Sequence, residues 1–285
     1  MVRIGRITAP RENIMLNRLL VATAAAAVGL ALAAVPAAAQ TLEKIKQRGA
    51  LVVGTKADYK PFGFRDPSGA IVGFEPDIAK LAADKLGVKI EIEPVVSSNR
   101  MQFLQQGKID LMIATMNDKP DRRLLVGIIE PLYYASGVNV LANKKAALKT
   151  WELLKDQKIC GIQGAWYNKN IQQDYGAETV AFKGTSEVYS ALKGNNCVAF
   201  VYDDTLVMAN LLEPEWKDYE MPFKTIADEP WGLAVKLGEE SFYKFMAGTV
   251  ADWHRSGLVL QLEKKYGLSN TAFALKMNAE YKAKK

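Results

Sequence analysis

The chain has 285 residues, 24% of them charged, and a formal net charge of +6. This length suffices for one large domain or for two lobes of ordinary size. Lysines and arginines form no stripe with interleaved aromatic residues, so nucleic acid is not expected as a partner. One histidine and two cysteines form no cluster with metal-ligand spacing, so the sequence predicts neither a metal nor another cofactor.

Residues 1–39 have the pattern of an export signal. A basic start precedes an Ala-, Leu- and Val-rich run over residues 19–35, which ends in Pro36 and three alanines; the basic residues are Arg3, Arg6, Arg11 and Arg18. These are the parts of a secretory signal peptide, with cleavage expected after Ala39. Because the basic part is long, Met15 is an alternative start. A membrane anchor is the alternative interpretation, which the small residues after Pro36 disfavour.

Helix and strand signals alternate along the first part of the remaining chain. Residues 51–54 predict a strand and residues 66–69 a turn. A helix is expected over residues 76–86, where apolar residues recur at 3.6-residue spacing before Gly87. The next predicted elements are a strand over residues 90–95, a short helix over 99–106, a strand from 109 and an extended segment over 131–142.

The same pattern then restarts. Thr150 is expected to cap a helix, and strands are predicted over residues 158–162, 179–182 and 197–202, with helices over 166–174, 186–193 and 204–212 between and after them. A strand over 231–235 precedes two helices over 241–254 and 258–266. Alternating strands and helices predict mostly parallel sheets with helices on both faces. Periodicity does not say whether the last helices rejoin the first part.

Cys160 and Cys197 are the only cysteines. In an exported chain, an isolated pair predicts a disulfide bond. Both lie at the starts of apolar, strand-like runs, and neighbouring parallel strands would bring them together. Two buried free thiols remain the alternative, because sequence alone does not fix the distance between the two Cα atoms.

A polar turn follows the apolar strand that begins at residue 109. Thr115 and Asn117 offer a hydroxyl and an amide, and Arg122 adds a planar cation that can bind a carboxylate through two parallel hydrogen bonds. Ligands of open α/β sheets bind beyond the carboxyl ends of strands, where this turn is expected. The sequence therefore predicts an anion site here, with an ordinary solvated loop as the alternative.

A series of short motifs runs through the whole mature chain. It comprises Tyr-x-Pro-Phe over residues 59–62, Gly-Phe-Glu-Pro-Asp over 73–77, Ser-Ser-Asn-Arg over 97–100, Thr-x-Asn over 115–117, Pro-Asp-Arg over 120–122, Gln-Gly over 163–164, Tyr-Asp-Asp-Thr over 202–205 and Lys-Lys-Tyr-Gly over 264–267. In this order the motifs resemble the amino-acid-binding family of bacterial periplasmic solute-binding proteins, the exported receptors of ABC importers. Each motif alone would be a weak signal.

The resemblance implies a two-lobed α/β fold of the type II periplasmic-binding-protein kind. Hinge crossings near residues 134–135 and 230–231 would place residues 40–134 and 231–285 in lobe one and residues 135–230 in lobe two. The resemblance also implies a periplasmic monomer that closes around an amino acid by a hinge motion and delivers it to an inner-membrane ABC permease.

Residue by residue, the resemblance makes Arg122 the partner of the ligand's α-carboxylate, with hydrogen bonds from Thr115 and Asn117. Asp204 would accept the α-ammonium group, and a helix N-cap is its alternative role. The adjacent Asp203 is expected to point to the other face of the sheet, because side chains alternate along a strand.

Aromatic residues are expected to wall the same site. Tyr59 and Phe62 would pack on the ligand, or serve only as core residues. The chain departs from the family at Ala165 and Trp166, where many members have Ser or Thr. Backbone N–H groups at this helix start could still meet a carboxylate, whereas Trp166 would narrow the site.

Three further residues bear on ligand specificity. Ser97 and Arg100 resemble the Ser-x-Asn-Arg turn of glutamate- and aspartate-binding members, and Lys56 lies where those members place another cation. Additional positive charges favour a second carboxylate on the ligand, so an acidic amino acid or a related dicarboxylate is expected. A neutral amino acid is the alternative if Arg100 and Lys56 lie at the surface.

The same fold also hosts enzymes such as cyclohexadienyl or arogenate dehydratases, and sensor domains. The sensor interpretation is disfavoured because no kinase or anchor segment follows. Catalysis is disfavoured because no carboxylate pair or nucleophile has catalytic spacing. The nominal acid–base candidates are Glu75, Glu130, Glu187 and His254.

Overall fold

A five-stranded sheet organises the first lobe of the computed structural model, which describes residues 41–284; the predicted signal peptide lies outside these residues. The strand order is β5-β1-β6-β14-β7. β1 pairs in parallel with β5 and β6, whereas β14 pairs antiparallel with β6 and β7. The strands are β1 (Ala50–Thr55), β5 (Lys89–Pro94), β6 (Leu111–Met112), β7 (Gly127–Ile128) and β14 (Ala234–Val235). Because β14 lies far along the chain, lobe one is built from two separate segments.

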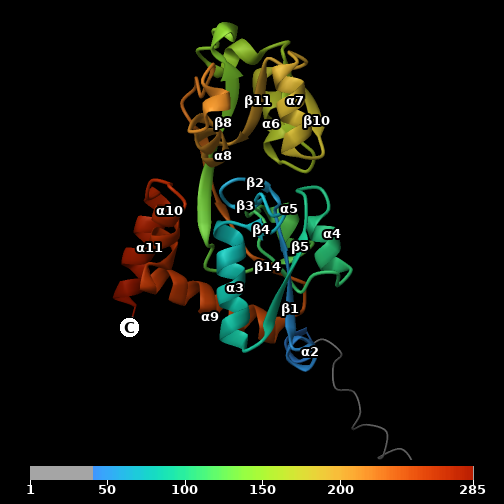
Figure 1. Ribbon diagram of the computed structural model, residues 1–285, viewed down its shortest axis with the longest axis vertical. Helices are drawn as coiled ribbons and strands as arrows, with labels where there is room; N and C mark the ends of the chain where they lie inside the picture. The colour runs from blue at the N-terminus through green and yellow to red at the C-terminus, as the bar shows by residue number, and fades with distance from the viewer. Residues whose placement is uncertain (1–40, 285) are drawn as a thin grey trace, which may run out of the picture. The chain divides into compact units, whose positions relative to one another are not determined.

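Helices and a small sheet complete lobe one (Figure 1). The helices are α2 (Thr41–Arg48), α3 (Phe74–Leu86), α4 (Arg100–Gln105), α5 (Pro120–Arg123), α9 (Glu240–Ser256), α10 (Leu258–Lys265) and α11 (Ala272–Ala283). The small sheet joins β2 (Asp58–Tyr59), β3 (Gly63–Arg65) and β4 (Ile71–Val72). α3 buries Ile78 and Ala82 from its apolar face and ends at Gly87, whose φ of 70° suits a glycine.

A second sheet defines lobe two. Its strand order is β10-β9-β11-β8-β12, and β13 pairs with β8. The strands are β8 (Tyr134–Asn143), β9 (Lys158–Ile162), β10 (Glu178–Phe182), β11 (Ala199–Asp203), β12 (Tyr219–Glu220) and β13 (Ile226–Trp231). The helices are α6 (Tyr167–Tyr175), α7 (Thr185–Lys193) and α8 (Asp204–Leu211), with short 3₁₀ turns over Lys144–Ala146, Trp151–Leu154 and Pro214–Trp216.

Two antiparallel strands join the lobes. β8 and β13 pair so that Ala135 lies opposite Pro230 and Tyr134 opposite Trp231. Figure 1 shows β8 extending from lobe two toward lobe one. Tyr134 and Trp231 pack on Phe62 at ring-centroid distances of 5.0 and 4.9 Å. This aromatic packing holds the lobe-one ends of the two connecting strands in place. Each ring pair contributes about 0.5–1.5 kcal/mol to stability beyond the contribution of its buried area.

The predicted α/β class with two lobes is confirmed, with differences in detail. Each of the two large sheets mixes parallel and antiparallel pairs, because β14 pairs antiparallel in lobe one and β8 pairs antiparallel with its neighbours in lobe two. The single strand predicted over residues 231–235 is wrong: β13 ends at Trp231 and β14 begins at Ala234. The helix expected after Thr150 is only a 3₁₀ turn. The periodic pattern missed α11 and the small sheet, whose strands are two or three residues long.

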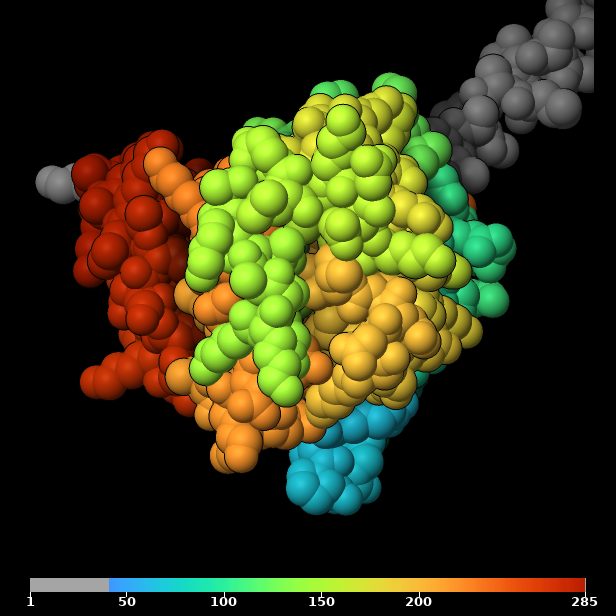
Figure 2. All heavy atoms as spheres, turned by 90° about the horizontal axis from the view of Figure 1, so that it is seen from above, coloured from blue at the N-terminus to red at the C-terminus, as the bar shows by residue number. Residues whose placement is uncertain are grey.

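Figure 2 views the molecule from the lobe-two side. Residues of lobe two, in green to orange, cover most of this face, and the red C-terminal helices lie at one side. Along residues 41–284, no helix is both long and apolar enough to cross a membrane.

The predicted disulfide bond is confirmed. Cys160 in β9 and Cys197 just before β11 are joined, with their Cα atoms 5.5 Å apart. β9 and β11 are neighbouring parallel strands, so the reason given from the sequence also holds. Both cysteines are buried.

We expect reduction of this disulfide to lower the free energy of unfolding by about 3–4 kcal/mol, because it closes a loop whose ends lie 37 residues apart. Urea unfolding with and without a phosphine reductant measures the loss. The double variant Cys160→Ala, Cys197→Ala should show the loss under both conditions. Equal stability of the oxidised protein and the double variant would contradict the expectation.

Candidate functional site

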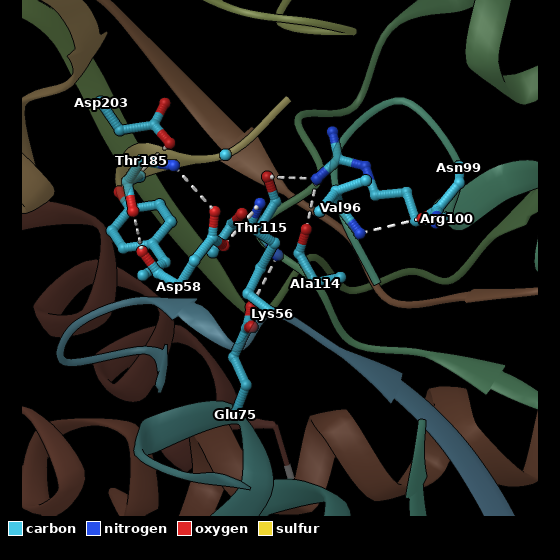
Figure 3. A network of polar contacts seen from close by, with 12 residues as sticks. Lys56, Asp58, Glu75, Val96, Asn99, Arg100, Ala114, Thr115, Thr185 and Asp203 are labelled. Carbon is cyan, nitrogen blue, oxygen red and sulfur yellow. Dashed lines mark hydrogen bonds and ion pairs between the residues drawn. The ribbon is translucent and has the colours of Figure 1, made fainter. Parts of the chain in front are cut away.

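Six polar residues from both lobes gather where the lobes meet, and we call them the interlobe polar cluster. Lys56 follows β1, Thr115 and Asn117 follow β6, Arg100 begins α4, Arg122 lies in α5, and Asp203 ends β11. Each residue is at most 4% exposed. Figure 3 shows four of them together: Lys56, Arg100, Thr115 and Asp203. Buried charges are rare without partners, so this cluster is the first candidate for a ligand site.

The two arginines of the cluster are held by backbone carbonyl groups. Arg100 Nη1 donates to the carbonyl oxygens of Ala114 and, at 3.1 Å, Thr115. Arg122 Nη1 donates to Asn117 O at 3.0 Å, and its Nη2 donates across the lobes to Gly164 O at 3.2 Å. Burial, and to a lesser degree the charge of Arg100, lower the pKa of Arg122 to about 10. An anion between the two guanidinium groups would relieve both effects.

Thr115 has a strained backbone that Glu75 supports. Its φ is 47°, an outlier for a β-branched residue and a feature that gathers at functional sites. Its N–H donates to Glu75 Oε1 at 2.6 Å, and the Tyr133 hydroxyl donates to the same oxygen. Burial raises the pKa of Glu75 to about 7. Glu75, a nominal catalytic candidate from the sequence, therefore positions the turn that carries Thr115.

The orientation predicted for Asp203 is wrong. Its carboxylate Oδ2 accepts a hydrogen bond from the Tyr59 hydroxyl at 3.1 Å, and its Oδ1 is buried without a partner among the described residues. The prediction assumed that Asp203 and Asp204 are consecutive residues of one strand. Strand alternation does not relate the two side chains, because β11 ends at Asp203 and α8 begins at Asp204. Burial raises the pKa of Asp203 to about 7. A cation placed beside it would stabilise the charged form.

Asp204 instead ties α8 to the connecting strand β8. Its Oδ1 accepts hydrogen bonds from Ser136 Oγ at 2.8 Å and from Gly137 N at 3.1 Å. It is the first residue of α8, and the N-cap position belongs to Asp203. The structure thus brings Asp203 rather than Asp204 into the interlobe polar cluster.

The predicted aromatic residues lie beside the cluster. Tyr59 is fully buried, and its hydroxyl reaches lobe two at Asp203 and, at 2.8 Å, Thr205. Phe62 is also fully buried, but its neighbours are the rings of Tyr59, Phe74, Tyr134 and Trp231. Tyr59 therefore contacts the polar site, whereas the recorded ring contacts of Phe62 are those of a core residue.

A second interlobe contact lies at Gly164 and Trp166. Gly164 has φ +82°, and a Cβ there would come within 2.8 Å of the Ser97 backbone, so only glycine permits this approach. Lys119 Nζ of lobe one lies 3.7 Å from the centroid of the Trp166 ring, within cation–π distance. Ala165 makes a turn hydrogen bond to Ile162 O. Trp166 thus occupies the lobe-two side of this contact.

Several buried side-chain atoms near this junction have no hydrogen-bond partner among the described residues. The donors are Lys56 Nζ, Arg100 Nε, Asn117 Nδ2 and Trp166 Nε1, the hydroxyl of Thr115 can act either way, and the acceptors are Asp58 Oδ1, Glu75 Oε2 and Asp203 Oδ1. Buried polar groups rarely lack partners. Donors and acceptors are both present, which suits a ligand that carries carboxylate oxygens and an ammonium group.

The other nominal acid–base candidates have structural partners. Glu187 Oε2 accepts from the N–H groups of Lys183 and Gly184. Glu130 pairs with Arg123 at 2.6 Å on the surface. His254 Nε2 lies 2.7 Å from Leu132 O. Residues 41–284 contain no group of three or more His, Cys, Asp and Glu side chains able to hold a metal ion.

Two α/β lobes, two connecting strands and buried charges from both lobes define a protein that binds a small ligand between its lobes. Residues 51–269 match the family described as bacterial extracellular solute-binding proteins, family 3. The chain belongs to this family.

Curated relatives and solved structures agree with this assignment. The chain is 32% identical to the ABC transporter glutamine-binding protein GlnH of Bacillus subtilis over 79% of this chain and 84% of the relative. It is 27% identical to the glutamate/aspartate import solute-binding protein of Escherichia coli, with 82% of each chain covered. Holo ArgBP from T. maritima superposes with a TM-score of 0.71 at 26% identity, over 79% of this chain and 99% of the other. The fold is that of type II periplasmic binding proteins.

We expect Glu75 to make stability depend on pH. Its folded pKa of about 7 lies above the ordinary value of 4.5, so its contribution is full below pH 4.5 and is lost as the pH rises through 7. Glu75→Gln stays neutral, so its free energy of unfolding should fall less between about pH 5 and pH 8, by on the order of 2 kcal/mol. Urea unfolding at several pH values measures this.

The surface variant Glu130→Gln serves as the control and should keep the wild-type pH dependence. Parallel profiles for Glu75→Gln and the wild type would show that this carboxyl does not titrate in the range.

Proposed function

We propose that this protein is the periplasmic substrate-binding protein of an amino-acid ABC importer. It is a monomer that captures an acidic amino acid between its lobes and delivers it to an inner-membrane permease. The observation that carries the proposal is Asp203 Oδ1 of lobe two, which is buried without a hydrogen-bond partner among residues 41–284 and lies beside buried cations of lobe one. An α-amino acid, with an ammonium and a carboxylate group on one carbon, complements that pair of charges.

The ligand's backbone groups are assigned first. Arg122 binds the α-carboxylate, and Thr115 and Asn117 add hydrogen bonds from their partnerless side-chain atoms. Asp203 accepts the α-ammonium group, and Tyr59 holds the other oxygen of Asp203 in place. Because these residues come from both lobes, ligand binding favours the closed arrangement.

The ligand's side chain is assigned to the remaining cations. Lys56 and Arg100 are both buried in addition to Arg122, and three cations in one site favour a second carboxylate on the ligand. The family's curated relatives do not decide the matter, because their names specify glutamine as well as glutamate and aspartate.

Glutamine is the second candidate ligand. The observation favouring it is that Arg100 Nη1 is already bound to two backbone carbonyl groups, and that Lys56 is paired with Asp58 at 3.1 Å. The protein itself then supplies acceptors to Arg100 and a counter-charge to Lys56, which leaves less need for a second carboxylate on the ligand.

Two measurements test the proposed function. Mass spectrometry of small molecules released from protein purified from the periplasm identifies any retained ligand. Calorimetric titration with L-glutamate, L-aspartate, L-glutamine, L-arginine and L-cystine ranks the affinities. Tightest binding of glutamate or aspartate supports the proposal, whereas tight binding of glutamine or arginine without any of the acidic amino acids refutes the acidic specificity.

We expect Asp203→Asn to weaken amino-acid binding by about thirtyfold or more, because it removes a charge-assisted contact worth about 2–3 kcal/mol. Asp204→Asn should have a clearly smaller effect, since its carboxylate is used within lobe two. Titration of both variants with the same amino acid compares them directly. A larger loss in Asp204→Asn would restore the assignment made from the sequence.

We expect Lys56→Met to change ligand preference. Glutamate and glutamine have nearly the same shape, so their affinity ratio reports the charge near the ligand's side chain. Removing a buried cation should lower that ratio at least about tenfold in favour of glutamine. An unchanged ratio would place Lys56 away from the ligand's second carboxylate. Lys60→Met, which removes an exposed cation, is the matched control.

A further inference from the structure

We propose that Asp58 is a positioning residue that couples the ligand-sensing Lys56 to closure of the two lobes. This inference rests on the proposed function for the identity of the ligand, but not for the contact itself. Asp58 lies in β2 of lobe one, and it contacts residues of both lobes. Figure 3 shows it between Lys56 and Thr185 of lobe two.

The lobe-one side of the contact is an ion pair with Lys56. Lys56 Nζ lies 3.1 Å from Asp58 Oδ1. Lys56 is fully buried, and its ammonium group has no acceptor with hydrogen-bond geometry among the described residues. Burial lowers the pKa of Lys56, and the charge of Asp58 opposes that effect. Asp58 therefore helps to keep Lys56 charged, while the N–H groups of the Lys56 ammonium remain available to a ligand.

The lobe-two side of the contact completes the start of α7. Asp58 Oδ2 accepts a hydrogen bond from Thr185 N at 3.1 Å, and Asp58 O accepts one from Thr185 Oγ1 at 2.7 Å. The N-cap residue of α7 is Gly184, which has no side chain to cap the helix. A carboxylate from the other lobe thus satisfies the free N–H of the first residue of α7 and places a negative charge at the helix start.

The two sides are linked through one carboxylate. When the lobes separate, Thr185 loses both hydrogen bonds and both Asp58 oxygens can turn to Lys56. When the lobes close, Oδ2 is committed to α7, and only Oδ1 remains beside Lys56. The ammonium group is then less completely neutralised by the protein. A ligand carboxylate at Lys56 therefore favours the same state that the Thr185 hydrogen bonds favour.

The surroundings of Asp58 fit a contact that forms and breaks. A groove of about 320 Å³ lies beside it and is lined by both lobes, including Val96, Arg65, Gly184 and Glu187. The Asp58 side chain remains 20% exposed. Water can therefore reach the carboxylate as the hydrogen bonds to Thr185 break. Opening of the lobes then leaves the Asp58 charge hydrated.

The test compares variants of this contact with a matched interlobe contact. Asp58→Ala removes both roles of the side chain, and Thr185→Val removes only the hydroxyl contact. The control is Glu213→Gln, which weakens the exposed interlobe pair of Lys60 and Glu213. The dissociation rate of L-glutamate is measured by stopped flow. The closed fraction is measured by single-molecule energy transfer between one dye on each lobe, with and without L-glutamate.

We expect Asp58→Ala to raise the L-glutamate dissociation rate about tenfold and to lower the closed fraction of the ligand-free protein. Thr185→Val should raise the rate about threefold to fivefold, and Glu213→Gln should change it less than about threefold. In a Lys56→Met background, Asp58→Asn should no longer change the glutamate-to-glutamine affinity ratio, because the ion pair is already absent. A merely structural role would not produce that dependence.

Three results would overturn the inference. They are a folded Asp58→Ala variant with unchanged dissociation rate and closed fraction, an equal effect of Glu213→Gln, and an Asp58→Asn effect on selectivity that persists without Lys56. Thermal unfolding by circular dichroism establishes that each variant is folded, and Asp58→Asn, which removes the carboxylate charge at nearly the same size, serves if Asp58→Ala is not. If L-glutamate does not bind, the proposed ligand fails, but the closed fraction of the ligand-free variants still decides the role of Asp58.

Discussion

Burial of unlike charges between two lobes is the constraint on which the rest of this structure depends. Lys56, Arg100 and Arg122 are all almost inaccessible to water, and burial lowers the pKa of each. Asp203 and Glu75 are buried in the same region with raised pKa values. Charges removed from water in this way are costly unless they find partners. The ligand of the proposed function, a zwitterion with an additional carboxylate, would supply partners to the charges of both lobes at once.

Backbone geometry fixes the shape of this site. The strained Thr115 is held by Glu75 and Tyr133, and Gly164 allows the lobe-two turn to approach Ser97 closely. Arg100 is fixed by two carbonyl groups. Side chains that are already oriented lose little conformational freedom on binding. The affinity for a ligand therefore depends more on its electrostatic fit to these residues than on their rearrangement.

Ligand choice within the family must come from side chains on a shared framework. Relatives named for glutamine and for glutamate and aspartate match about four fifths of this chain, so the fold does not choose among them. Lys56 adds charge on lobe one, whereas Trp166 adds an aromatic ring on lobe two and packs on Lys119. Together they make a site that is more cationic on one side and more apolar on the other.

The sequence by itself determined the two α/β lobes, the disulfide bond and the polar turn from Thr115 to Arg122, because periodicity, cysteine count and local spacing are short-range signals. Tertiary structure decided which aspartate enters the interlobe polar cluster, because β11 ends at Asp203 and strand alternation stops there. It also decided the contact of Asp58 with Thr185, which joins residues 127 positions apart. No local pattern encodes that pair, since the Gly184 start of α7 is completed only when the other lobe lies against it.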